Sequence, residues 1–172
     1  PEDLEKKEKL IANTLLKINK NVKTVLKKAE HHGEVFRTQK LKWLAGKKTK
    51  IAEYKENNVK LRFNVEKVYF SIRLSTERKR IAKQVKKGEI ILVMFSGAAP
   101  YPTVISKNTD AKDIVGVEIN PAGHKYGLLN LELNKTNNVK LYCGDVKKVV
   151  PKLKKKFDRI LMPLPKSAED FL

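Results

Sequence analysis

Two neighbouring segments of the sequence combine residue types that can bind a nucleoside. The loop Phe95–Pro100 consists mainly of small residues, which would let a ligand approach the backbone, and it follows an apolar run. Glu118 ends the next apolar run, roughly 20 residues further along, where a carboxylate can accept hydrogen bonds from both hydroxyls of a ribose. The alternatives are a simple tight turn for the loop and a helix-capping or solvent-facing acid at Glu118.

Two further positions follow apolar runs in the same way. Asp145, after Gly144, can hold an adenine amino group through an adjacent contact or can only cap the next helix. Pro163 belongs to a Pro-x-Pro turn that can form a pocket wall or can only end a strand. Together the loop, Glu118 and Asp145 predict an adenosine-binding site. Because the sequence contains no Gly-x-Gly-x-x-Gly motif, S-adenosylmethionine is favoured over NAD as the ligand.

The elements that would carry these residues alternate between strands and helices. Apolar runs predict buried strands at 90–95, 114–118, 139–143 and 157–162. The intervening patterns predict helices at 76–85, 121–135 and 146–153, and a short helix that ends at Lys107. This alternation predicts an α/β fold with a Rossmann-like, doubly wound parallel sheet. Ligands bind at the carboxyl ends of the strands in such sheets, so we expect the four features to meet at one edge.

The first part of the chain has a different pattern. Apolar residues recur at helical spacing over residues 3–18, Val22–Leu26 reads as a strand, and Phe36–Trp43 is extended or mixed. Alternating residues at Lys50–Tyr54 and Val59–Val65 flank a polar turn and predict a β-hairpin. We therefore predict a small basic α+β domain at residues 1–66, followed by the Rossmann-like domain at residues 67–172.

The charge of the chain indicates a polyanionic partner. The net charge is +19, and residues 1–90 hold 25 basic but only 11 acidic side chains, which favours RNA or DNA binding by the N-terminal half. The alternative is an ordinary solvated surface. The stretch 37–50 contains no acid and interleaves its basic residues with Trp43. The candidate RNA-binding residues in this stretch are Arg37, Lys40, Lys42, Lys47 and Lys48.

Several functional classes are excluded or disfavoured by what the sequence lacks. No apolar run approaches the roughly 20 residues of a membrane span. The single cysteine, Cys143, excludes an intrachain disulfide framework and a zinc-finger cluster, and its apolar strand predicts a buried core thiol. The three histidines have no metal-like partners in the sequence, so no metal site is predicted. A cytoplasmic location is the simplest reading of this cysteine content.

The segment Val68–Arg78 is recognisable. It closely resembles the Tyr-Phe-Ser-Pro-Arg-Leu-x-x-Glu-Arg segment of archaeal tRNA guanine-N1 methyltransferases, which act on the guanosine 3′ of the anticodon. The resemblance extends in order through residues 33–37, 44–46, 94–97, 118–121, 144–145 and 158–165. The related aminocarboxypropyl transferases of wybutosine synthesis share this architecture. The resemblance implies an enzyme that moves a methyl group from S-adenosylmethionine to N1 of that guanosine in the anticodon region of tRNA. We expect the protein to be a monomer.

The resemblance also implies roles for individual residues. Glu77 resembles the general base that takes the guanine N1 proton, and Arg37 resembles the arginine that orders the target guanine. Glu77 follows Arg73 by four residues and precedes Arg78, so we expect these two cations to keep its carboxylate ionised. The alternative for Glu77 is a first-turn helix acid. The residues expected at the cofactor are Tyr69, Arg73, Arg78, Phe95, Ser96, Gly97, Glu118, Ile119, Asp145, Val146 and Pro163.

The sequence departs from the family pattern at positions that bear on the reaction. Val93 stands where many relatives carry Asp, Ala98-Ala99 replaces a more glycine-rich stretch, and Pro163 replaces the Asn of an Asn-Leu-Pro motif. The sheet of the family normally has seven strands, whereas the sequence accounts for four, so we expect a sheet that is truncated at the C-terminus. Two alternative functions follow: aminocarboxypropyl transfer from the same cofactor, and a catalytically silent RNA-binding module.

Overall fold

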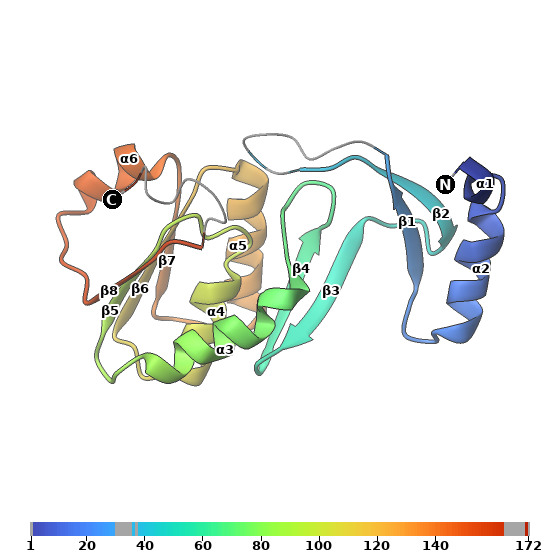
Figure 1. Cartoon of the computed structure of the whole chain (residues 1–172). Coiled ribbons are helices and arrows are strands. Elements are labelled where there is room, and N and C mark those ends of the chain that lie inside the picture. Colours follow the sequence, from blue (N-terminus) through green and yellow to red (C-terminus); the bar gives the residue numbers. More distant parts are fainter. Residues whose placement is uncertain (1, 30–35, 37, 164–170, 172) are drawn as a thin grey trace.

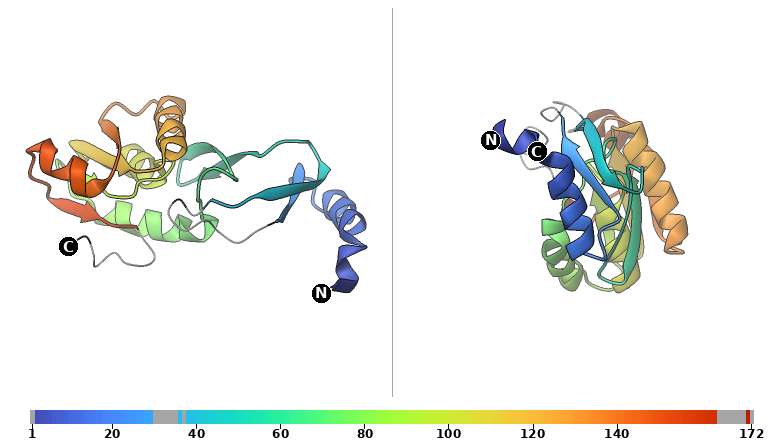
Figure 2. Two further views of the ribbon diagram at one scale, coloured as in Figure 1. Left: turned by 90° about the horizontal axis from the view of Figure 1, so that it is seen from above. Right: turned by 90° about the vertical axis from the view of Figure 1, so that its right-hand side faces the viewer.

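A computed structural model describes residues 2–29, 36, 38–163 and 171 of the chain. The described elements form an elongated molecule, with an α/β sheet at one end and a helix on a two-stranded sheet at the other (Figure 1). The view from above shows the hairpin of β3 (Ile51–Glu56) and β4 (Val59–Asn64) between these two ends (Figure 2, left).

The α/β end is built on a four-stranded parallel sheet in the order β7-β6-β5-β8. Its strands are β5 (Ile90–Val93), β6 (Asp113–Glu118), β7 (Val139–Cys143) and β8 (Arg159–Leu161). The continuous apolar run of β5 is buried on both faces, because Ile91 and Val93 point to one layer and Leu92 to the other. The predicted Rossmann-like α/β sheet is confirmed.

Helices cover both faces of this sheet. One layer contains α3 (Ser75–Gln84), α4 (Pro100–Asn108) and α5 (Pro121–Leu133), preceded by the short 3₁₀ turn η1 (Ile72–Leu74). The other layer contains α6 (Val146–Val149) and the 3₁₀ turn η2 (Val150–Leu153), which pack on Leu92, Val115 and Val117. The predicted helices are therefore present with ends shifted by a few residues, and the predicted helix at 146–153 is split into α6 and η2.

The N-terminal end consists of one amphipathic helix against a strand pair. Helices α1 (Glu2–Glu5) and α2 (Glu8–Ile18) divide the predicted helix at residues 6–7, and Ala12 of α2 is buried. Strands β1 (Thr24–Lys28) and β2 (Leu41–Gly46) pair in antiparallel fashion beside α2. Glycine is required at the end of β2, because Gly46 has a φ of +82° and a Cβ there would lie 2.4 Å from the Lys23 carbonyl oxygen.

The predicted hairpin is confirmed, and its turn explains why it forms. Asn57 and Asn58 have φ values of 41° and 62°, as the two central residues of a type I′ turn require. Val59, Leu61 and Phe63 alternate with exposed residues along β4, and they share a core with Ala82, Ala98 and Val104 from the α/β end. The boundary at residues 66/67 stays a prediction, whereas this core packs the hairpin against the helices of the α/β end.

A buried ion pair fastens the turn end of the hairpin to α3. The side chains of Glu56 and Arg78 are each only 2% exposed. Arg78 Nη2 lies 2.6 Å from Glu56 Oε2, Arg78 Nε donates to Glu56 Oε1, and Nη2 also donates to the Ser71 carbonyl at 3.2 Å. Because both charges are removed from water, each depends on the other for its stabilisation.

The ion pair gives a prediction about stability. Replacing Glu56 with alanine leaves the Arg78 guanidinium buried without its carboxylate, so Glu56→Ala is expected to lower the free energy of unfolding by about 3–5 kcal/mol. Chemical denaturation measures this loss. The control is Glu53→Ala on β3. The exposed Glu53 carboxylate lies 3.8 Å from Arg62 Nε, so this substitution should lower the free energy of unfolding by less than about 1 kcal/mol. Equal effects of the two substitutions would contradict the assigned role of the buried pair.

The prediction of a buried thiol at Cys143 is wrong. Cys143 is exposed, because β7 is an edge strand of the described sheet and Tyr142 beside it is also exposed. The apolar appearance of the strand comes from Val139 and Leu141, which contact the helical layer; Cys143 is on the same face by alternation but lies at the carboxyl end of the strand. Among the described helices, none is long and apolar enough to cross a membrane.

Candidate functional site

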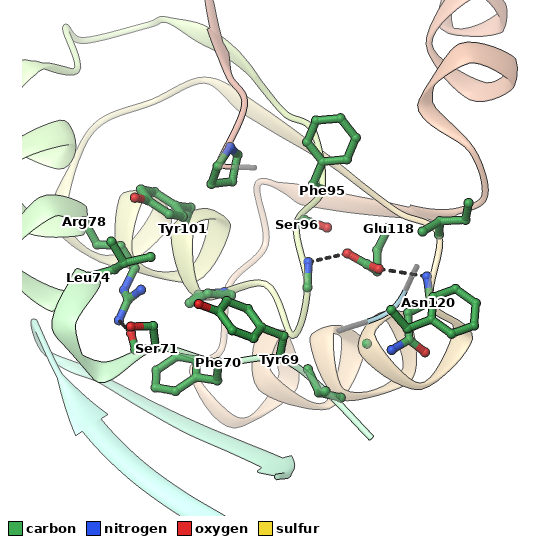
Figure 3. A pocket seen from close by; sticks show the side chains of 17 residues that line it. Tyr69, Phe70, Ser71, Leu74, Arg78, Phe95, Ser96, Tyr101, Glu118 and Asn120 are labelled. Carbon is green, nitrogen blue, oxygen red and sulfur yellow. Dashed lines mark hydrogen bonds between the residues drawn. The ribbon is translucent and has the colours of Figure 1, made fainter. Parts of the chain in front are cut away.

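A pocket lies at the carboxyl ends of β5 and β6, where the fold predicts a ligand (Figure 3). Several of the predicted cofactor residues line it together, although they come from distant parts of the sequence. These residues are Tyr69, Arg78, Phe95, Ser96, Gly97, Glu118, Ile119 and Pro163. In Figure 3, Arg78 and Glu118 lie on opposite sides of the pocket, with the aromatic rings of Tyr69 and Tyr101 between them.

The loop after β5 follows an unusual backbone path. Phe95, Gly97 and Ala99 have φ values of 55°, 56° and 59°, so every second residue is left-handed. Two of these residues carry a side chain, and the left-handed conformation costs each of them roughly 1–2 kcal/mol. The Ser96 N–H donates to the Val117 carbonyl at 2.8 Å, which ties the loop to β6. The result is that the Gly97 N–H faces the end of β6.

Glu118 is held at that end by backbone donors. Its Oε2 accepts from the Gly97 N–H at 2.6 Å, and its Oε1 accepts from the Asn120 N–H at 2.7 Å (Figure 3, dashed lines). Burial raises the pKa of the Glu118 carboxyl above its ordinary value, and the backbone donors offset this only in part. Each carboxylate oxygen has two lone pairs, so each can accept one more hydrogen bond from a ligand. Gly123 leaves room for the side chain, because a Cβ there would lie 3.1 Å from Glu118 Cγ.

Asn120 is a pocket residue that the sequence analysis did not select. Its Oδ1 accepts from the Ala122 N–H at 2.9 Å and caps α5, while its Nδ2 donates to the Lys67 carbonyl at 2.8 Å. The second bond holds the segment that leads to Tyr69 against the start of α5. The Asn-Pro pair before a helix could have indicated the cap, but nothing local indicates the bond to Lys67.

The remaining surface of the pocket is mostly aromatic and apolar. Phe36, Phe70, Leu74 and Tyr101 line it and were not selected from the sequence. Phe70 also packs on Phe63 at 4.5 Å between ring centroids, so the pocket wall is part of the hairpin core. Burial raises the pKa of the Tyr101 hydroxyl. The Ser96 Oγ is buried and has no hydrogen-bond partner among the described residues.

Three predicted cofactor residues lie outside the pocket lining. Arg73 is exposed and lines a separate hollow beside Ser71. Asp145 caps α6, because its Oδ1 accepts from the Lys147 N–H at 2.9 Å, which is the alternative given for it. Val146 is buried in the core beside Val117. The contact of these three residues with a cofactor stays a prediction.

Glu77 lies in the first turn of α3 and does not line the pocket. Its two carboxylate oxygens accept from Arg80 Nε and Nη2, both at 2.7 Å, and this guanidinium lowers the pKa of the Glu77 carboxyl. The expected cations were Arg73 and Arg78, but Arg78 is bound to Glu56 and the cation at Glu77 is Arg80. Arg37, the other predicted catalytic residue, lies outside the described residues.

The predicted RNA-binding lysines lie on or beside β2. Lys40, Lys42, Lys47 and Lys48 are all exposed, and Trp43 between them is 40% exposed. The Lys42 Nζ atom lies 4.0 Å from Glu8 Oε2 of α2, which is a weak, exposed ion pair that leaves the lysine able to bind another anion. Within the described ranges, His, Cys, Asp and Glu side chains form no group of three or more that could hold a metal ion.

Comparison with known proteins identifies the family of the chain. Residues 52–172 match the TRM5/TYW2 methyltransferase domain, and residues 1–49 match the TYW2 N-terminal domain. The chain belongs to the TRM5/TYW2 family. The predicted resemblance is therefore confirmed, and the two family matches meet near residue 50, where β3 begins.

Individual members of the TRM5/TYW2 family resemble the chain over most of its length. The tRNA (guanine(37)-N(1))-methyltransferase Trm5b of Pyrococcus abyssi is 37% identical over 100% of the chain and 50% of its own length, and its crystal structure has a TM-score of 0.88. The match to the structure of a complex of aTrm5 and tRNALeu covers 97% of this chain and 48% of the aTrm5 chain, with 33% identity and a TM-score of 0.87.

A structure of TYW2 from P. horikoshii with MeSAdo is 27% identical and has a TM-score of 0.70. It covers 85% of this chain and 51% of its own. The chain thus spans about half of the length of each of these relatives.

The environment of Glu118 predicts a pH dependence of stability. A carboxyl whose pKa is raised on folding favours the folded state at low pH, and this contribution is lost as the pH rises from 4.5 through the raised value. The variant Glu118→Gln cannot ionise. The stability of the wild type relative to this variant, measured by denaturation at a series of pH values, is therefore expected to fall as the pH rises. A difference that stays constant with pH would show that burial does not raise this pKa.

Proposed function

We propose that the protein modifies tRNA by transferring a methyl group from S-adenosylmethionine to N1 of the guanosine 3′ of the anticodon. The observation that carries the proposal is the buried carboxylate of Glu118 at the carboxyl end of β6, held by the Gly97 and Asn120 N–H groups in a pocket with aromatic walls. Membership of the TRM5/TYW2 family supports the class of reaction, and the named relatives support tRNA as the substrate.

The residues of the pocket fit an adenosine-containing cofactor. Glu118 would accept the two ribose hydroxyls with its remaining lone pairs, and the buried Ser96 hydroxyl would gain a hydrogen-bond partner. The side chains of Phe95 and Ile119 line the same pocket and would contact the base. When bound, S-adenosylmethionine supplies an electrophilic methyl group on a sulfonium sulfur.

Glu77 is proposed as the base for this reaction. Guanine N1 carries a proton near neutral pH, so a carboxylate that accepts this proton makes N1 a better nucleophile. Arg80 keeps Glu77 ionised, and each carboxylate oxygen bound by Arg80 still has a lone pair for the N1 proton. Glu77 lies in the first turn of α3, which directly follows the pocket residue Leu74, and this supports a position near the target base. Arg37 is proposed to orient the guanine.

The proposed base gives a kinetic prediction. Glu77→Gln preserves the shape of the side chain and removes its basicity, so the single-turnover rate is expected to fall roughly 10²–10⁴-fold. Affinities for the cofactor and for tRNA should change little. The matched control is Glu132→Gln, an exposed helical glutamate on α5 that should react at the wild-type rate. If Glu77→Gln reacts at nearly the wild-type rate under conditions in which the methyl-transfer step limits the rate, Glu77 is not the base. It would then act only as an acid that favours the start of the helix.

The basic N-terminal part is proposed to bind the tRNA phosphates through Lys42 of β2 and the exposed lysines beside that strand. Reversing two charges, Lys47→Glu with Lys48→Glu, should weaken tRNA binding and reduce the slope of log affinity against log salt by roughly one or two. Cofactor affinity should not change. The matched control is Lys86→Glu with Lys87→Glu, an exposed pair between α3 and β5. Equal losses in the two double variants would favour a general charge effect over a local interface.

Aminocarboxypropyl transfer is the second candidate, and a specific observation favours it. Transfer of this group from S-adenosylmethionine leaves methylthioadenosine, whereas methyl transfer leaves S-adenosylhomocysteine. The P. horikoshii TYW2 structure contains MeSAdo, and residues 1–49 of this chain match the TYW2 N-terminal domain. Both reactions use the same pocket but break different bonds at the sulfur.

Mass analysis of tRNA distinguishes the candidates. An unmodified tRNA with guanosine 3′ of the anticodon is incubated with the protein and S-adenosylmethionine, then digested and weighed. A gain of about 14 daltons on that nucleoside supports methyl transfer, and a gain of about 101 daltons supports aminocarboxypropyl transfer. A tRNA with adenosine at that position is the control. No gain, together with no heat of cofactor binding in calorimetry, would leave only an RNA-binding role.

A further inference from the structure

Asn130 is a fully buried amide that does not line the pocket but contacts the loop that forms it. It lies on the inner face of α5 and is 0% exposed. Its Nδ2 donates to the Ala98 carbonyl at 2.9 Å, and its Oδ1 accepts from the Arg62 N–H of β4 at 2.7 Å. One side chain therefore bonds both the loop after β5 and the hairpin.

The Ala98 carbonyl depends on a donor from outside its own helix. Ala98 precedes Ala99, the N-cap of α4, whose carbonyl accepts the first helical hydrogen bond from Thr103. The Ala98 carbonyl has no such role, and the residue is only 2% exposed. A buried carbonyl without a donor is costly, so the amide of Asn130 stabilises the orientation of the peptide that joins Ala98 to the left-handed residue Ala99.

The neighbouring side chain of Asn134 also bonds to the hairpin, and comparing it with Asn130 shows which contact is specific to Asn130. Asn134 lies one helical turn further along α5, accepts from the Lys60 N–H at 2.9 Å and donates to the Lys60 carbonyl at 2.7 Å. Asn134 also donates to the backbone carbonyl of Asn130 at 2.7 Å. Both asparagines thus form hydrogen bonds with backbone groups on the edge of β4 that β3 leaves unpaired. Only Asn130 of these two also bonds to the loop after β5.

We propose that Asn130 is a positioning residue that fixes the loop Ser96–Ala99 in the shape that binds the cofactor and joins that loop to the hairpin. The path runs from Asn130 to the Ala98 carbonyl and then through the adjoining peptide to the Gly97 N–H, which holds Glu118. Asn130 itself needs no contact with the cofactor. This inference rests on the proposed function, because it assigns a cofactor to the pocket.

The first test compares two leucine variants by calorimetry with S-adenosylmethionine. Asn130→Leu removes the bonds to the loop and to the hairpin, whereas Asn134→Leu removes the bonds to the hairpin and to the Asn130 carbonyl but none to the loop. We expect Asn130→Leu to lower cofactor affinity by about tenfold or more, and Asn134→Leu to lower it by less than about threefold, with similar losses of thermal stability. An unchanged affinity in Asn130→Leu, or equal losses in both variants, would overturn the proposal.

A second variant keeps the proposal testable if Asn130→Leu does not fold. In Asn130→Asp a protonated carboxyl can accept from Arg62 and donate to Ala98, whereas an ionised carboxylate can only accept. Burial raises the pKa of such a carboxyl toward neutrality. The affinity of this variant relative to the wild type at the same pH should therefore decline between about pH 5 and about pH 8. A ratio that is independent of pH would overturn the proposal.

Hydrogen exchange separates failure of this inference from failure of the proposed function. The amides of Ser96–Ala99 should exchange faster in Asn130→Asp at high pH than in the wild type, and at the wild-type rate in Asn134→Leu, without any cofactor. If the wild type binds no S-adenosylmethionine but this pattern is seen, the assigned cofactor is wrong and the positioning of the loop stands. If the wild type binds the cofactor and the exchange rates are equal, the positioning role is wrong.

Discussion

The structure around the pocket depends on keeping one carboxylate buried with no cation beside it among the described residues. Glu118 is stabilised by the Gly97 and Asn120 N–H groups, and those two donors must be aimed by the backbone. The left-handed residues of the loop after β5 aim the first, and the N-cap of α5 aims the second. Because backbone dipoles do not neutralise the charge, the carboxyl keeps a raised pKa and retains lone pairs for a ligand.

The hairpin of β3 and β4 lies between the α/β end, which carries the pocket, and the basic N-terminal end of the molecule. Its apolar face shares a core with α3, α4 and α5, and its polar groups are fixed by the Glu56–Arg78 pair and by Asn130 and Asn134. The segment that carries Tyr69 is held between the hairpin and Asn120. The hairpin is thus packed on the α/β end, and the described links of β2 to the segment after the hairpin include a hydrogen bond from the Leu41 N–H to Glu66 Oε1 at 3.0 Å.

Local patterns were sufficient to predict the elements but not the long-range polar contacts. The buried strands were predictable because continuous apolar runs such as Ile90–Val93 fit a sheet covered on both faces, and the hairpin because two asparagines suit a type I′ turn. Glu118 could be selected from its place at the end of a strand. The pairing of Arg78 with Glu56 and the exposure of Cys143 depend on which surfaces meet after folding, and no local spacing encodes that. The pairing of Glu77 with Arg80 rather than Arg73 is different, because these two residues are three apart on α3, a spacing that the sequence contains.

The central claim is that Glu118 holds the ribose of an adenosine cofactor, and calorimetry with S-adenosylmethionine tests it directly. The variant Glu118→Ala loses one or two hydrogen bonds to a charged acceptor, each worth roughly 1.5–3 kcal/mol. Its affinity for the cofactor should be at least about tenfold lower than that of the wild type, with unchanged far-ultraviolet circular dichroism. Wild-type affinity in a folded Glu118→Ala variant would contradict the claim and remove Glu118 from the site.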